Sequence, residues 1–130
     1  MKTKPLMTLS AIFLAIIGIL LSFLPKEIAD YLGVELNVIT ILFLKMLSAL
    51  YLGFAILNWM AKGTLIGGIY NKPIAIGNLM HFGVGAIALV KIASNIQTHT
   101  VIIISLTAMY VFFALLFAYV FRTNPTKTKK

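Results

Sequence analysis

The sequence contains no cysteine and only three acidic residues, Glu27, Asp30 and Glu35, in a chain of 130. Without thiols, the chain can form no disulfide framework, no thiolate metal site and no redox dithiol. The acids lie in one short stretch, so the long apolar segments hold no paired carboxylates for acid–base catalysis. A nucleophile–base pair at a recognisable spacing and a phosphate-binding loop are also lacking. We therefore expect no metal and no cofactor. Whether the chain is an enzyme stays open, with enzymatic chemistry the least supported class.

Charged residues of either sign are scarce as well. They make up 11% of the chain and apolar residues 61%, whereas ordinary soluble proteins have about 25% charged residues. This imbalance indicates a lipid bilayer as the solvent. The formal net charge of +8 comes from residues in short loops and tails. They form no basic face along which phosphates could bind, so we expect no nucleic-acid partner.

Four apolar segments are long enough to cross a bilayer. An α-helix rises about 1.5 Å per residue and the hydrocarbon core is about 30 Å thick, so a span needs about 20 residues. We predict an all-α fold, a bundle of four transmembrane helices within one membrane domain (1–130). Its spans cover about residues 6–24, 38–60, 74–93 and 101–121. The first segment exceeds the apolar core of a signal peptide and lacks a cleavage site, so we expect it to be retained.

The segments that join the first three spans have their own signals. Pro25 ends the first helix, and the stretch from Pro25 to Gly33 reads as a short amphipathic helix that lies in the membrane interface, with Gly33 as a left-handed stop. The connection 61–72 is too apolar for a solvated loop, and we expect it to lie against the headgroups with a flexible point at Gly67-Gly68. Pro73 suits the first turn of the third span.

Charge asymmetry predicts the orientation. Four spans place both termini and the middle connection on one side, where eight basic residues lie: Lys2, Lys4, Lys62, Lys72, Arg122, Lys127, Lys129 and Lys130. The other side has two, Lys26 and Lys91, together with every acid. Positive charge accumulates on the cytoplasmic side of bacterial membrane proteins. We therefore predict a multi-pass protein of a bacterial-type inner (plasma) membrane with both termini in the cytoplasm, and we expect Trp59 to anchor the second span at that surface.

His81 is the first candidate for a functional side chain. Gly77, His81 and Gly85 recur every four residues and share one face of the third span, with Asn78 beside the histidine. Two glycines leave an open slot around the ring, about 10 Å into the bilayer by helical rise. The slot either receives a neighbouring helix, with His81 as a packing hydrogen bond, or binds a ligand or handles a proton. A metal or haem site is disfavoured, because no second histidine lies within a span.

Lys45 is the second candidate. Ala49 and Gly53 follow it at i+4 and i+8, so all three share a face that we expect to look into the bundle. Helical side chains lean toward the N-terminus, so Lys45 can reach outward to water or to one of the three acids. The alternative is an anion or headgroup site, with Ser105 or Thr107 of the fourth span as donors.

Small residues form stripes on the other spans. In the first span, Ala11, Ala15, Gly18 and Ser22 are spaced by four, three and four residues, and Ala114 and Ala118 share a face of the fourth. Such stripes let helices approach each other closely inside a membrane.

The layout of the whole chain resembles a known group. Four short spans, a first helix ended by proline, an acidic amphipathic outer loop and a glycine-rich third helix are similar to the small DoxX-like bacterial four-helix membrane proteins. The segments Tyr70-Asn71-Lys72-Pro73 and Asn78-Leu79-Met80-His81-Phe82 have the look of a family signature. Some members of that group are accessory subunits of larger membrane assemblies. The resemblance implies the same helical layout and assigns no residue a role.

Three function classes follow from these observations. The first is an accessory or interaction protein whose partners are the lipid bilayer and a second copy or another membrane protein. The second is a binder or carrier of a lipid or small hydrophobic molecule, using the slot at His81 or the Lys45 face. The third is a membrane-embedded enzyme. Close helix contact along Gly77, His81 and Gly85 would favour the first class, and a cavity that reaches His81 would favour the second.

Overall fold

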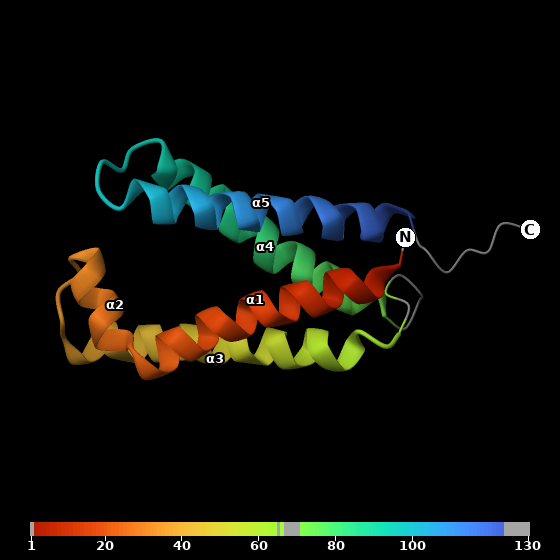
Figure 1. Ribbon diagram of the computed structural model, residues 1–130, viewed down its shortest axis with the longest axis horizontal. Coiled ribbons are helices and arrows are strands. Elements are labelled where there is room, and N and C mark those ends of the chain that lie inside the picture. The colour runs from red at the N-terminus through yellow and green to blue at the C-terminus, as the bar shows by residue number, and fades with distance from the viewer. Residues whose placement is uncertain (1, 65, 67–70, 124–130) are drawn as a thin grey trace, which may run out of the picture. The chain divides into compact units, whose positions relative to one another are not determined.

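The computed structural model describes residues 2–64, 66 and 71–123. This part of the chain contains no strand and five helices: α1 (Thr3–Phe23), α2 (Pro25–Leu32), α3 (Val38–Ala61), α4 (Lys72–Ala93) and α5 (Thr100–Thr123) (Figure 1). The four longer helices are apolar enough to cross a membrane. The all-α fold with four spans and a short helix after the first is therefore confirmed, and the protein is a multi-pass membrane protein.

The predicted spans agree with the observed helices to within three residues at every end. The differences arise because the apolar run measures only the part of a helix that suits hydrocarbon. Thr3, Lys72 and Thr100 extend their helices beyond that run, and backbone hydrogen bonding continues into the headgroup region. The flexible point expected at Gly67-Gly68 lies outside the described residues.

Local signals explain where the helices begin and end. Pro25 occupies the first turn of α2, where its missing N–H is not needed. Gly33 ends α2 with φ +67° and donates its N–H to the carbonyl of Asp30 at 3.1 Å. The side chain of Asn37 accepts the N–H of Thr40 at 2.8 Å and caps the start of α3. The left-handed stop at Gly33 and the place of Pro73 in the first turn of α4 are confirmed.

Residues 7–62 form one compact unit, in which α1 and α3 run antiparallel beside each other (Figure 1). The two helices come into close contact at the buried Gly18, where an added Cβ would lie 2.8 Å from Cγ and 3.2 Å from the backbone nitrogen of Leu52. Ser48 donates its hydroxyl to the carbonyl of Gly18 at 2.8 Å. The small-residue stripe of the first span therefore allows the close approach of another helix at Gly18, as predicted.

The short helix α2 packs against α3 in the same unit. Its Pro25 and Ala29 are buried, whereas Tyr31 and Leu32 are exposed. The exposed apolar surface of Tyr31 and Leu32 suits the membrane interface. Its placement there stays a prediction.

Residues 1–6 and 63–130 form the second unit, in which α4 and α5 pack side by side (Figure 1). Its interior is aromatic: Phe82 of α4 and Phe113 and Phe117 of α5 are at most 1% exposed. The hydroxyl of Thr3 accepts the N–H of Ile66 at 3.3 Å, so the start of α1 holds the connection that leads to α4.

The contact at Gly18 should tolerate no large side chain. We expect Gly18→Leu to lower the free energy of unfolding by about 1–3 kcal/mol, because the new side chain would overlap Leu52. Gly53→Leu is the matched control on α3, since nothing lies within 4 Å of its Cβ position. Unfolding in detergent micelles titrated with dodecyl sulfate measures both. Equal midpoints for the two variants would contradict the close approach.

Candidate functional site

His81 lies in the middle of α4, half-buried and facing α5. Its Nε2 is 3.4 Å from the hydroxyl oxygen of Tyr110, and the ring centroids are 5.7 Å apart. Either group can donate, depending on the histidine tautomer. At this length the bond is a weak one. The partner of the histidine is therefore a phenol of the same unit.

The slot predicted beside His81 is occupied by Tyr110. The tyrosine is 3% exposed, and its ring lies against Gly85, so a Cβ added at Gly85 would overlap it. The glycine lies one turn from His81 on the same face of α4, and its missing side chain makes the space for the ring. Close helix contact along this face is thereby observed at Gly85.

A cluster of aromatic side chains packs around Tyr110. Phe82 meets Tyr110 edge to face at 5.3 Å and stacks on Phe113 at 4.9 Å and on Phe117 at 5.8 Å. Each such pair contributes about 0.5–1.5 kcal/mol beyond its buried area. Moving the tyrosine away from Gly85 would break its contact with Phe82. We conclude that the His81–Tyr110 pair is part of a packed layer.

The other predicted members of the slot are placed differently. Asn78 is fully buried and donates its amide N–H to the carbonyl of Ile74 at 3.0 Å, one turn earlier in its own helix. Gly77 is half-buried. The amide of Asn78 thus serves at least in part to satisfy its own helix.

Within the unit formed by residues 7–62, the Lys45 face of α3 does not pack against α1, and whether it looks into the whole bundle stays a prediction. Lys45, Ala49 and Gly53 are all exposed. The buried face of α3 instead carries Ser48, Tyr51, Ala55 and Asn58. The reason is the interhelical bonding of Ser48 and Asn58, which turns a neighbouring stripe toward α1 and leaves the lysine out of that contact.

Of the groups that Lys45 could reach, the three acids do not pair with it. Its amine forms no ion pair with a carboxylate in the described part of the chain. Of the two hydroxyls proposed as co-donors, Ser105 is exposed and Thr107 donates to the carbonyl of Ile103 at 2.6 Å. The hydroxyl proton of Thr107 is thus used within its own helix, and the headgroup site at Lys45 stays a prediction.

The sequence did not predict one pair of linked hydrogen bonds that joins α1 and α3. Asn58 of α3 is fully buried and donates its amide N–H to the hydroxyl of Ser10 at 3.0 Å, which in turn donates to the carbonyl of Met7 at 3.1 Å. A lone amide inside an apolar span was the available signal, since it must find a partner within the membrane. The partner could not be found, because helical periodicity does not say which helix faces it.

The buried polar groups of the spans are engaged in such contacts. Among the described residues, every buried side-chain nitrogen or oxygen has a hydrogen-bond partner. Within the same residues, no three His, Cys, Asp or Glu side chains lie close enough to hold a metal ion. No family model, curated protein or solved structure matches the chain. The resemblance to DoxX-like proteins therefore stays a prediction.

Two glycines one turn apart in α4 provide a matched test of the packed layer. We expect Gly85→Ala to lower the free energy of unfolding by about 1–3 kcal/mol, because its methyl group would overlap the ring of Tyr110. Gly83→Ala meets nothing within 4 Å and should stabilise α4 by about 0.5–1 kcal/mol. Dodecyl sulfate titration of both variants measures the difference. A Gly85→Ala variant as stable as Gly83→Ala would show that Tyr110 does not pack there.

Proposed function

We propose that the protein is a small accessory or interaction protein of a membrane assembly. The observation that carries this proposal is the filled slot at His81, where Tyr110 lies against Gly85 and shares a hydrogen bond with the histidine. A ligand at that place would have to displace the tyrosine from Phe82. Catalysis and the recognition of a polar substrate need a polar group that is open to the substrate, and the buried polar groups of the described spans all have hydrogen-bond partners.

The outward faces of the spans support the same reading. Apolar side chains are exposed along all four, and among them lie small exposed residues such as Ala49 and Gly53 on α3 and Ala108 on α5. Small residues on an outward face let a partner helix come close, and van der Waals contact then drives association. The accessory subunits known in the DoxX-like group point in the same direction.

The partner experiment uses the protein extracted gently from its own membrane and examined by native mass spectrometry. We expect a complex of defined stoichiometry with a second copy or another membrane protein, unchanged by His81→Ala. Gly53→Leu should lose the partner by blocking the outward face of α3, whereas Gly83→Leu on α4 serves as the matched variant that keeps it.

The contrary result is a bound small molecule. A lipid or hydrophobic compound that is retained by the natural protein and lost from His81→Ala would make the chain a binder or carrier. A substrate that is converted in a His81-dependent manner would make it an enzyme. Either finding would overturn the accessory role.

We further propose a bacterial-type plasma membrane and cytoplasmic termini. The support is the bias of eight basic residues to two between the two ends of the bundle. All three acids lie on the side with fewer basic residues, within or next to α2.

Single cysteines give a direct test of orientation, since the natural chain has none. We expect Asp30→Cys to react with a membrane-impermeant maleimide in intact spheroplasts, because α2 faces outward in the proposed topology. Thr123→Cys, at the end of α5, should react only after permeabilisation. Both positions are exposed in the structure, so access depends on the side of the membrane. The reverse pattern of labelling would refute the orientation.

A further inference from the structure

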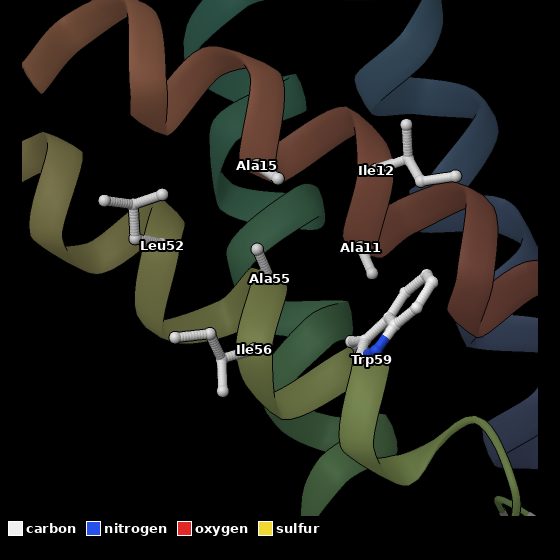
Figure 2. A pocket seen from close by; sticks show the side chains of 7 residues that line it. All are labelled: Ala11, Ile12, Ala15, Leu52, Ala55, Ile56 and Trp59. Carbon is white, nitrogen blue, oxygen red and sulfur yellow. The ribbon is translucent and has the colours of Figure 1, made fainter. Parts of the chain in front are cut away.

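A groove of about 320 Å³ lies between α1 and α3 on the surface of the unit formed by residues 7–62 (Figure 2). Ala11 and Ala55, which are 2% and 4% exposed, form its floor. Ile12 and Ile56 line its sides, and the indole of Trp59 stands at one end beside Ala11 (Figure 2). The small floor residues create the hollow, because larger side chains at the same positions would fill it.

The groove opens outward and is apolar throughout. Ile56 is 61% and Trp59 50% exposed, so α1 and α3 leave the sides of the groove uncovered. An apolar hollow inside a bilayer does not hold water, which needs polar partners. Its occupant is therefore hydrocarbon or a protein helix.

A positive charge marks one end of the groove. Lys62 follows the last residue of α3, and its Nζ lies 2.8 Å from the centroid of the Trp59 ring. A lysine over an indole face is a cation–π contact, which holds the charge at the mouth of the groove. Trp and Lys at the end of a span belong to the headgroup level. An occupant that fits has an apolar body inside the groove and an anionic group at Lys62.

We propose that this groove is a binding site for an anionic phospholipid, with one acyl chain along Ala11 and Ala55 and the phosphate at Lys62. Basic pockets between transmembrane helices on the cytoplasmic side bind anionic headgroups, and the orientation proposed above places Lys62 on that side. From Leu52 to Trp59 the groove extends about 10 Å by helical rise. That length matches part of an acyl chain, whereas a partner helix would need contact along much of the roughly 30 Å span.

The site is separate from the layer at His81 and does not depend on the accessory role. A single lysine near the membrane surface favours an anionic lipid by about 1 kcal/mol, which is about a five-fold preference in binding. The proposal therefore predicts a modest and measurable selectivity, and the selectivity resides in Lys62.

Trp59 provides the readout, because it is the one tryptophan of the chain and lines the groove. The full-length protein is placed in nanodiscs of equal parts phosphatidylglycerol and phosphatidylcholine, with bromine on the acyl chains of one lipid at a time. Bromine quenches an indole that it contacts. We expect brominated phosphatidylglycerol to quench Trp59 as if it bound about five times more tightly than brominated phosphatidylcholine.

Matched variants separate charge from groove shape. Lys62→Gln should bring the preference to about one, and Lys62→Arg should keep it. Lys91→Gln, at the far end of α4, is the charge control and should leave it unchanged. Ala15→Leu, which fills the groove, should also abolish the preference, whereas Ala108→Leu in the hollow between α4 and α5 should not. The preference is a ratio within each variant, so changes in Trp59 emission cancel.

Three outcomes would overturn the proposal. The first is equal quenching by both lipids in the natural protein. The second is a preference that survives Lys62→Gln or Ala15→Leu. The third is weak quenching by both lipids together with a dimer in native mass spectrometry, which would place a second copy of the chain over the groove. The first two results leave the partner experiment at Gly53 unaffected, and a dimer seated over the groove would be disrupted by Ala15→Leu and not by Gly53→Leu.

Discussion

The absence of water from the hydrocarbon core is the constraint on which this structure depends. A polar group there must find its partner inside the protein, and the observed contacts follow from that need. Ser48 bonds the carbonyl of Gly18, Asn58 bonds Ser10, and Asn78 bonds back to its own helix. In each unit, the polar side chains decide which stripe of a helix turns inward. The apolar residues do not select a face, because their free energy is similar in lipid and in the protein interior.

Glycine is the second determinant of packing in this structure, because a neighbouring side chain can occupy the space where a glycine has none. At Gly18 the neighbour is Leu52 of α3, whose backbone nitrogen comes within 3.2 Å of a Cβ position. At Gly85 it is the ring of Tyr110. Close packing over small residues replaces the hydrophobic effect, which contributes little between helices already in lipid. Each unit is thus held by a glycine contact with a hydrogen bond beside it, and its outer surface remains apolar.

The contrast between the hydrogen-bonded interior and the apolar outer surface has consequences for function. The buried polar groups of the spans are used in packing, and the exposed surface has features that packing does not explain. The groove over Ala11 and Ala55 ends at Trp59 and Lys62, where a charge meets the headgroup level. A small protein with a packed interior and specific outer faces acts through what binds to those faces, whether a lipid or a partner helix.

The sequence by itself determined the number of spans, the short helix after the first and the ends of the helices, because hydropathy, proline and glycine act locally. It also singled out the face of α4 with His81 and Gly85. It could not identify Tyr110 as the occupant of that face, nor Ser48 as the residue of α3 that bonds α1. Only the tertiary structure decided these points. Periodicity shows which residues share a helix face, whereas the direction of that face depends on hydrogen bonds and contacts with residues distant in the chain.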